Sequence, residues 1–504
     1  IGGGDIYYTN GGNVGIGTDT PSEKLVVNGN IAILNPIFKE VPPVVISLEG
    51  FTWTQSGTLE GLADGDHFGY SVSLSSDGTT VAIGAPATYS ASAKGHVRIY
   101  TLIGGQVHSI QTIEGLVAGD RFGYRVSLSS DGTTVAIGAP YNDGAPGADS
   151  GHVRIYTWDG NAWTLGQTIQ GLAAGDRFGW SVSLSSDGTT VAIGTPYNDG
   201  APGADSGHVR IYTLIGGTWT PSGTLNAYAA GDQFGHSVSL SSDGTTVAIG
   251  ARYNGDNGYK SGHVRIYTWN GTWTQSGTLI GYAAGDKFGS SVSLSSDGTT
   301  VAIGASDNDD GGAHSGHVRI YTLIGGTWTQ LGQTLVGFAE YDYFGSSVSL
   351  SSDGTTVAIG AILNDGPGAS NSGHVRIYML IGGIWTPVGA AIQGLAASDY
   401  FGRSVSLSSD GTTVVIGAPF NDVGGPDSGQ VRIYNINNNI KISSATSLVI
   451  SDGNVGIGTD TPDHTLDVSG NIKANKLFLT STGLRPGTGT GSIILGHSTV
   501  GTAG

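Results

Sequence analysis

The sequence predicts an all-β protein: a seven-bladed β-propeller of four-stranded blades, inserted between short β-rich, fibre-like terminal segments. One stretch, represented by residues 178–212, recurs seven times, and a fixed period of this size indicates a repeat architecture. Each copy contains short runs of alternating side-chain type that end at Gly, Asp, Asn or Pro, as β-strands do. Four such strands in about 55 residues make a unit of the size of a propeller blade.

The repeat is marked by a Phe-Gly pair. It starts at Phe68, Phe122, Phe178, Phe234, Phe288, Phe344 and Phe401. In the third copy we expect strands at residues 181–184, 191–193, 209–212 and 218–225. Asp187-Gly188 lies between the first two strands and predicts a two-residue hairpin, because both residue types tolerate positive φ.

The fourth strands predict how the ring closes. Seven such runs occur, but the first, residues 53–59, precedes the first Phe-Gly pair, and none follows the last three-strand set. Residues 53–59 should therefore pair with the blade built from residues 401–434. Such a split blade joins the two ends of the ring and removes an exposed sheet edge.

The order F-G, S-V-S-L, V-A-I-G-A-P, as in residues 122–140, resembles the FG-GAP repeat of the integrin α-subunit propeller and its microbial relatives. The resemblance covers roughly residues 51–438 and implies the propeller fold. In that family calcium lies in the first hairpin loop, held by a run of Asp and Asn. Here residues 185–190 read S-S-D-G-T-T with one carboxylate, whereas calcium takes six to eight oxygen ligands. We therefore expect no cofactor.

A second repeat lies outside the propeller. Residues 13–31 and 454–472 read NVGIGTDTPSEKLVVNGNI and NVGIGTDTPDHTLDVSGNI. They resemble short β-repeats of phage tail fibres and related surface fibres.

We expect domains at 1–43, 44–438 and 439–504. Each terminal copy is too short to bury a core alone, so we expect homo-oligomers or filaments. The expected assembly residues are Val14, Ile16, Leu25, Val27, Ile31, Val455, Ile457, Leu466, Val468 and Ile472.

Composition restricts the partners. The net charge of −18 argues against nucleic acid, whose phosphates require a basic surface. There is no cysteine, so thiol catalysis and thiolate metal sites are excluded. No apolar run approaches the ~18 residues of a membrane span, so we expect no membrane insertion.

Simple strand alternation places the loops before each Phe-Gly pair and the loops after each second strand on one rim. An Asp stands two residues before each Phe; it is interpreted as a turn cap, with a ring of ligands as the alternative. The other loops vary in sequence. Their variation has two possible explanations: the loops bind a ligand, or nothing constrains their sequence. The candidate ligand-binding residues are Asn142, Asp143, Asp149, Asn198, Asp199, Asp205, Asn254, Asp256, Asp307, Asp309, Asn364, Asp365, Asn421 and Asp422. Calcium bound there, with Asp143, Asp149, Asp309 and Asp310 among its ligands, is an alternative.

Two tempting catalytic or metal patterns are interpreted as structural. The histidines of G-H-V-R-I-Y occur in six of the seven blades, with Gln430 in the seventh, and lie too far apart to share one metal. We expect Arg154 or Arg210 to pair with an Asp of a neighbouring blade. Glycosidic chemistry usually needs two placed carboxylates, and the six Glu lie mostly outside the repeats. We expect no enzyme.

The sequence leaves a binding module and a structural subunit as hypotheses. Combined, they give an extracellular fibre, filament or appendage subunit that displays a propeller for adhesion to a cell-surface glycan or protein receptor. One alternative is a discrete carbohydrate-binding head of a viral or phage tail fibre without self-polymerisation; another is a propeller glycosidase or lyase. We expect the protein at the cell surface, on an appendage or on a virion.

Overall fold

The computed structural model describes residues 51–88, 92–103, 106–366 and 369–436. It also describes the strand backbone at 6–8, 14–16, 437–438, 442–444, 446–451, 454–457 and 466–468. Every regular element in these ranges is a β-strand, and the propeller strands form seven sheets. The predicted all-β, seven-bladed fold is confirmed.

The strands of each blade follow one another in the chain. The first strands are β4 (Ser71–Leu74), β8 (Arg125–Leu128), β12 (Ser181–Leu184), β16 (Phe234–Leu240), β20 (Ser291–Leu294), β25 (Phe344–Leu350) and β30 (Ser404–Leu407). The second strands are β5 (Thr80–Ala85), β9 (Thr134–Ala139), β13 (Thr190–Thr195), β17 (Thr246–Ala251), β21 (Thr300–Ala305), β26 (Thr356–Ala361) and β31 (Thr413–Ala418). The third strands are β6 (His96–Ile103), β10 (His152–Trp158), β14 (His208–Ile215), β18 (His263–Trp269), β22 (His317–Ile324), β27 (His374–Ile381) and β32 (Gln430–Asn438).

The fourth strands vary more. They are β3 (Phe51–Glu60), β7 (Gln106–Glu114), β11 (Trp163–Gln170), β15 (Thr218–Asn226), β19 (Trp273–Ile280), β23 (Thr327–Gln330) with β24 (Leu335–Val336), and β28 (Ile384–Pro387) with β29 (Ile392–Gln393). The last two are broken in the middle, at Gly332 and Gly389, which both have φ near +70°. Unbroken strands absorb the irregularity as a bulge, for example between Ile211 and Tyr212.

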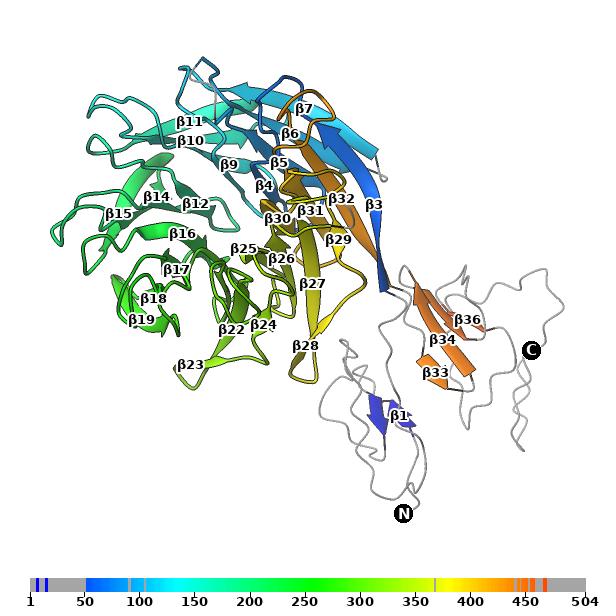
Figure 1. Cartoon of the computed structure of the whole chain (residues 1–504). Helices are drawn as coiled ribbons and strands as arrows, with labels where there is room; N and C mark the ends of the chain where they lie inside the picture. Colours follow the sequence, from blue (N-terminus) through cyan, green and yellow to red (C-terminus); the bar gives the residue numbers. More distant parts are fainter. Residues whose placement is uncertain are drawn as a thin grey trace, which may run out of the picture. The chain divides into compact units, whose positions relative to one another are not determined.

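Figure 1 shows the blades arranged in a ring, with β4, β12, β16 and β30 toward its middle and β7, β11, β15 and β19 at its outer edge. The ring closes through a split blade. Its strand order is β3-β32-β31-β30, so the first propeller strand completes the last blade, as predicted. Trp53 Nε1 also donates a hydrogen bond to Val388 O at 3.1 Å. Both ends of the ring are thereby joined without an open edge.

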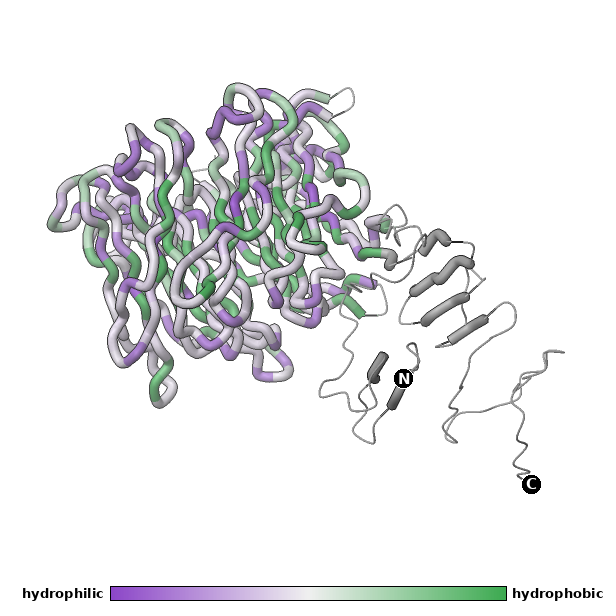
Figure 2. The backbone as a smooth tube through the Cα atoms, turned by 90° about the horizontal axis from the view of Figure 1, so that it is seen from below, coloured by the Kyte–Doolittle hydropathy of each residue, from purple (hydrophilic) through white to green (hydrophobic). Residues whose placement is uncertain are grey.

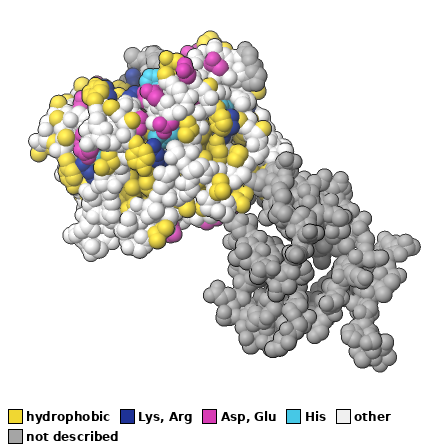
Figure 3. All heavy atoms as spheres, turned by 60° about the horizontal axis from the view of Figure 1, so that its bottom comes forward, with side chains coloured by type: hydrophobic (Ala, Val, Ile, Leu, Met, Phe, Trp, Pro, Cys, Tyr) yellow, Lys and Arg dark blue, Asp and Glu magenta, His cyan; other side chains and the backbone are white. Residues whose placement is uncertain are grey.

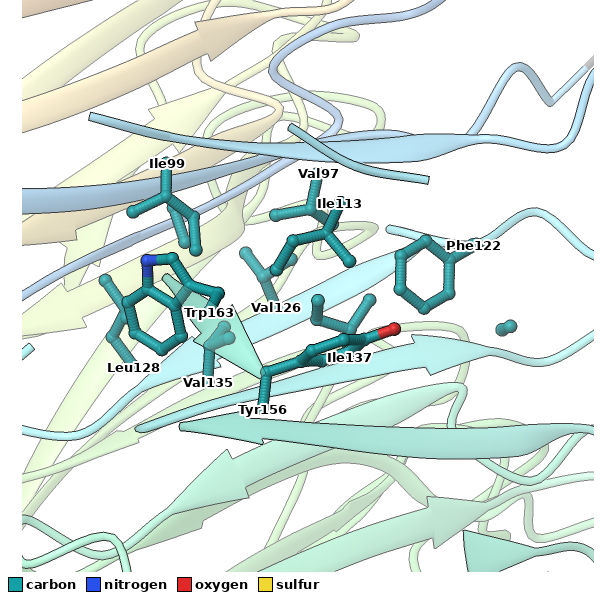
Figure 4. Packing of buried hydrophobic residues seen from close by; sticks show 12 residues of the cluster. Val97, Ile99, Ile113, Phe122, Val126, Leu128, Val135, Ile137, Tyr156 and Trp163 are labelled. Carbon is teal, nitrogen blue, oxygen red and sulfur yellow. The ribbon is translucent and has the colours of Figure 1, made fainter. Parts of the chain in front are cut away.

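The hydrophobic core is a series of layers between neighbouring blades. In one layer Val97, Ile99 and Ile113 of the first blade face Phe122 and Val126 of the second (Figure 4). The second strands are buried at nearly every position because both of their faces are covered by adjacent blades. Polar and apolar residues alternate over short distances along the chain (Figure 2). This pattern follows from short strands that each span from one rim to the other.

The glycines of the repeat allow the blades to approach closely. Gly179, next to Phe178, has φ of 92°, a region that favours glycine. A Cβ on Gly194 of β13 would lie 2.1 Å from Gly235 O of the next blade. Any side chain there would force the blades apart, which explains why this strand carries glycine.

The smaller compact unit contains β33 (Ile442–Ser444), β34 (Thr446–Ser451), β35 (Asn454–Ile457) and β36 (Leu466–Val468). β34 pairs antiparallel with β33 and β35, and β35 pairs parallel with β36. Near the N-terminus β1 (Ile6–Tyr8) pairs antiparallel with β2 (Val14–Ile16). Of the expected assembly residues, Leu25, Val27, Ile31 and Ile472 lie outside the described residues. The other six lie on β2, β35 and β36.

Candidate functional site

The propeller has two rims of different construction. The hairpin rim consists of the turns between first and second strands, such as residues 185–189. The loop rim consists of the D-x-F-G turns, such as residues 176–179, and the loops between second and third strands. These two kinds of loop meet as predicted: Phe178 N donates to Ser150 O of the preceding blade at 3.1 Å. The loop rim therefore combines segments from adjacent blades.

The hairpin rim uses its polar groups internally. Ser185 Oγ and Thr189 N donate to Asp187 Oδ1 at 2.6 and 2.9 Å, and Thr189 Oγ1 donates to Oδ2 at 2.8 Å. Burial alone would raise the pKa of Asp187, but these hydrogen bonds lower it. The predicted two-residue hairpin is wrong: β12 ends at Leu184, β13 starts at Thr190, and among residues 185–189 only Gly188 has positive φ. The aspartate side chain shapes this turn together with the backbone bond that Gly188 N donates to Ser185 O at 3.0 Å.

The same turns join the blades into a closed ring. Ser186 N donates to Ser242 O at 2.9 Å, and Ser409 N of the last blade donates to Ser76 O of the first at 2.9 Å. The intervening bonds complete the circle at Ser76, Ser130, Ser186, Ser242, Ser296, Ser352 and Ser409. The hairpin rim is thus uniform and internally satisfied.

The aspartates before the Phe-Gly pairs are turn caps, in agreement with the first interpretation. Asp176 is buried, and Asn198 Nδ2 donates to its Oδ1 at 3.0 Å. In five further blades Asp120, Asp232, Asp286, Asp342 and Asp399 accept the equivalent amides, whereas Asp66 of the first blade accepts the backbone N–H of Ala63 at 3.0 Å. Burial raises the pKa of Asp176, which outweighs the lowering by the Asn198 hydrogen bond. These carboxylates hold loops together rather than facing a ligand.

The candidate residues on the loop rim have partners inside the rim. The amides of Asn142, Asn198, Asn254, Asn364 and Asn421 are the donors to the capping aspartates. The carboxylates of Asp143, Asp199, Asp309, Asp365 and Asp422 each accept a backbone N–H five or six residues later in the same loop. Asp149 and Asp307 pair with Arg177 and Lys287, and Asp256 with His263. Asp205 lies at a left-handed position, φ 51°.

Among the described residues no group of three or more His, Asp or Glu side chains is placed to hold a metal ion. Asp309 and Asp310 are adjacent, but Asp309 caps its loop and Asp310 lies 3.3 Å from His317 Nδ1. In the described ranges, no cluster of carboxylates supports a calcium site at this rim.

The repeated histidines and arginines of the third strands fill the interior. His152, His208, His263 and His317 are buried, and burial lowers the pKa of each to about 4. The expected pairing of Arg154 or Arg210 with an Asp is wrong. Arg154 lies over the Phe122 ring at 5.4 Å and Arg210 over Phe178 at 5.3 Å. For these two arginines the aromatic ring of the repeat takes the place of a carboxylate.

Sequence reasoning missed the inner part of the loop rim. The residue between Asp and Phe-Gly has a left-handed backbone in every blade, with φ between 51° and 55°: His67, Arg121, Arg177, Gln233, Lys287, Tyr343 and Tyr400. This conformation costs energy for any residue with a side chain. The signal was present, because this position varies while the Asp, Phe and Gly around it do not.

Cations and aromatic rings alternate along part of this inner rim. Arg121 lies 3.6 Å from the centre of the Tyr141 ring, and Arg177 lies 4.8 Å from Tyr141 and 4.4 Å from Tyr197. Farther along, Arg252 and Lys260 lie 4.6 and 4.4 Å from Tyr253. The cation–aromatic arc comprises Arg121, Arg177, Arg252, Lys260, Lys287, Tyr141, Tyr197, Tyr253 and Tyr259.

A second group continues from the arc to the propeller axis. The residue after each Phe-Gly pair is Tyr70, Tyr124, Trp180, His236, Ser290, Ser346 or Arg403. Tyr70, Tyr124 and Trp180 are buried against one another, with neighbouring ring centres 4.9 to 5.0 Å apart. Arg403 donates to Tyr70 Oη at 2.9 Å across the ring closure. The axial cluster comprises Tyr70, Tyr124, Arg125, Trp180, His236 and Arg403.

One exposed apolar or aromatic side chain stands four residues before the Asp of each D-x-F-G turn: Leu62, Leu116, Leu172, Tyr228, Tyr282, Phe338 and Leu395. Three of them, Tyr228, Tyr282 and Phe338, cover the guanidinium groups of Arg265, Arg319 and Arg376 at 3.4 to 3.6 Å. In Figure 3 hydrophobic, acidic and basic side chains are interspersed over the described surface among polar side chains and backbone.

The FG-GAP repeat family matches seven segments of the chain: 53–100, 114–156, 170–212, 224–267, 273–321, 337–378 and 393–434. The chain belongs to the FG-GAP repeat family. None of the curated proteins matches it. The terminal repeats lie outside the matched segments, and their resemblance to fibre repeats stays a prediction.

The FG-GAP propeller is consistent with a binding or adhesion-type domain. FG-GAP repeats are typical of extracellular or surface proteins. No helix long and apolar enough to cross a bilayer occurs in the described part of the chain.

Proposed function

We propose that this protein is a subunit of an extracellular fibre, filament or appendage that displays its FG-GAP propeller for adhesion. The loop rim would face a cell-surface glycan or a protein receptor. The observation that carries this proposal is the difference between the rims: one is uniform and internally hydrogen-bonded, and the other concentrates side chains that differ from blade to blade. A rigid scaffold with one variable face is the usual architecture of a binding module.

Assembly is assigned to the terminal repeats. The shared string N-V-G-I-G-T-D-T-P at both ends of the chain suits head-to-tail stacking of subunits, a heterologous contact that need not close. Val14, Ile16, Val455 and Ile457 lie on described strands of these repeats. Burying such side chains is worth about 1.5–3 kcal/mol each. The propeller, by contrast, covers its own apolar layers.

We assign the protein no enzymatic activity. Asp120, Asp176 and the equivalent aspartates are buried under asparagine amides, so they do not form the pair of substrate-facing carboxylates that glycoside hydrolysis requires.

Two measurements on the same samples test the proposal. Sedimentation should show oligomers or filaments for the full chain and monomers for residues 44–438. Adhesion of both forms to intact cells should be reduced by Tyr259→Ala on the loop rim, where the side chain is 75% exposed. The matched control is Thr189→Ala on the hairpin rim. A monomeric full chain that still adheres would support the alternative of a discrete fibre head; equal loss from both substitutions would overturn the assignment of the loop rim.

A further inference from the structure

The positive charge of the propeller is concentrated in one place. Residues 51–436 contain fifteen Lys and Arg, and seven of these are the interior arginines of the third strands. Of the remaining eight, five belong to the cation–aromatic arc and two, Arg125 and Arg403, to the axial cluster. Only Lys94 lies elsewhere. The turns of the hairpin rim instead carry seven aspartates and no cation. The loop rim thus holds nearly all of the other cations of the propeller; Arg177 and Lys287 are paired there with Asp149 and Asp307, whereas no ion pair among the described residues includes Arg121, Arg125 or Arg252.

Arg125 departs from the repeat at a structural cost. The equivalent residue in the other six blades is a serine whose Oγ donates to a glycine carbonyl of the next blade, as Ser181 does to Gly235 O at 2.8 Å. The corresponding bonds are made by Ser71, Ser237, Ser291, Ser347 and Ser404. Arg125 gives up this bond between blades. Its own NH1 donates to the neighbouring Tyr124 O at 3.2 Å.

No ion pair involves Arg125 in the part of the chain that the structure describes. Burial and the charge of Arg403 lower the pKa of Arg125, so the two guanidinium groups act on each other. Burial, followed by the charges of Arg252, Arg125, Arg403 and Lys287, also holds the pKa of His236 well below its usual range. Like charges gathered at a partly buried site are stabilised by an anion.

The axis is filled unevenly, which leaves these cations within reach. Tyr70, Tyr124 and Trp180 fill the side of the first three blades. On the other side the equivalent residues include Ser290 and Ser346, which are small, and Arg125 and Arg403 remain partly exposed. The indole Nε1 of Trp180 is buried and has no hydrogen-bond partner among the described residues. The cluster thus has a hydrogen-bond donor still to be satisfied.

We propose that the axial cluster binds the carboxylate of an acidic saccharide, with the sugar rings lying along the cation–aromatic arc. Guanidinium groups bind carboxylates with paired, charge-assisted hydrogen bonds. The exposed ring of Tyr259 can pack against the apolar face of a sugar ring, which favours a saccharide over an acidic peptide. A sialic acid and a uronic acid share this chemistry. The inference deepens the proposed adhesive function and rests on it.

The test uses the full chain and isothermal titration with 3′-sialyllactose, trigalacturonate, neutral lactose and poly-L-glutamate. One or both acidic sugars should bind, and lactose should bind at least about tenfold more weakly, because it lacks the carboxylate that accepts hydrogen bonds from the guanidinium groups. Affinity for the acidic sugar should fall as salt is added.

Two substitutions restore residues that other blades already carry, so both should fold. Arg125→Ser installs the serine of the other six blades, and Arg403→Ser the serine of Ser290 and Ser346. Each substitution should lower the affinity for the acidic sugar by about tenfold or more. Lys94→Ser, the matched control, removes one positive charge from outside both groups and should leave the affinity unchanged.

The outcomes separate this inference from the proposed function. Equal binding of lactose and the acidic sugars, or an unchanged affinity in Arg125→Ser, overturns the anion site. Cell adhesion that is insensitive to Arg125→Ser and Arg403→Ser but lost with Tyr259→Ala leaves adhesion standing without the anion site. Arginine-dependent binding of poly-L-glutamate alone makes the ligand an acidic peptide and overturns the saccharide assignment.

Discussion

The two rims of the propeller are made by the same repeat, yet they treat their aspartates in opposite ways. On the hairpin rim Asp187 is exposed, accepts three hydrogen bonds from its own turn, and has a lowered pKa. On the loop rim of the same blade Asp176 is buried under Asn198 and has a raised pKa. Both carboxylates are structural, because each is occupied by hydrogen bonds within the propeller.

This difference teaches where function can reside in a nearly uniform repeat. The hairpin rim closes through seven equivalent backbone hydrogen bonds between serines, so a change in the backbone path of any one turn would break the ring. On the loop rim the buried aspartates fix the loops from below, and the residues above them differ between blades. Residues that stabilise the rim and residues that vary between blades thus lie only a few positions apart in the chain.

The largest effect should come from opening the ring that presents both rims. Deleting residues 1–60 removes β3 and with it the buried Phe51 and the Trp53 bond to Val388. The loss should be at least about 5 kcal/mol, because buried side chains contribute about 1.5–3 kcal/mol each and a sheet edge is exposed. Thermal unfolding and light scattering measure it. Deleting only residues 1–43 is the control and should leave the melting temperature unchanged; equal melting of both truncations would refute closure by β3.

A smaller effect should follow from a single hairpin turn. Asp187→Ala removes three hydrogen bonds at an exposed carboxylate and should cost about 1 kcal/mol at neutral pH. Asp243→Ala is an internal replicate, because Asp243 accepts the same bonds from Ser241 and Thr245. Denaturant unfolding should give similar losses for both. If Asp187→Ala abolished ligand binding without changing stability, the hairpin rim would be a site and the contrast between the rims would fail.

The pH dependence sharpens the contrast, since its sign should differ between the rims. The folded-state pKa of Asp187 is lowered, so its stabilisation is present above the ordinary value of about 3.9 and is lost as pH falls through the folded pKa. The folded-state pKa of Asp176 is raised, so ionisation costs stability at neutral pH and acidification relieves this cost.

From pH 7 toward pH 4, wild type should therefore gain stability relative to Asp176→Asn. Below pH 4, its advantage over Asp187→Asn should shrink. Denaturant midpoints across this range provide the measurement. Parallel profiles for the two variants would contradict the opposite environments of the two carboxylates.

The smallest effect should come from chelation. Because one aspartate replaces the usual calcium cage in each hairpin turn, we expect EDTA to leave the melting temperature nearly unchanged. A bound ion at 100 times its dissociation constant would instead contribute about 2.7 kcal/mol. Scanning calorimetry with and without calcium distinguishes these cases, and a large decrease on chelation would place calcium in the loops of the other rim.

Much of the fold was predictable because the same strand pattern occurs seven times in the sequence. Period, Phe-Gly pairs and the displaced run at residues 53–59 were sufficient for blade number and ring closure. The breaks in the fourth strands at Gly332 and Gly389 were not anticipated. The alternating pattern does not show that a glycine adopts a left-handed conformation where the unbroken strands have a bulge.

The candidate site was harder to predict. Composition singled out Asn198 and Asp199 as polar loop residues, but the sequence does not show that Asn198 bonds Asp176 and that Asp199 caps its own loop. Arg154 was assigned a carboxylate partner because the local pattern does not show that the Phe122 ring lies beneath it. Comparing the repeats in register would have found Arg125, which stands where six copies have serine.

The split blade also has a mechanical consequence. Gly61 N donates to Gly429 O and Ser56 Oγ to Ile433 O, so β3 and β32 run in opposite directions. The residue that begins β3 and the one that ends β32 therefore lie at the same end of this pair. Tension between the chain segments that flank the propeller would open the pair one hydrogen bond at a time instead of shearing all of them together. Under such a pull the last blade would open first, at low force, and release the stored length of the ring.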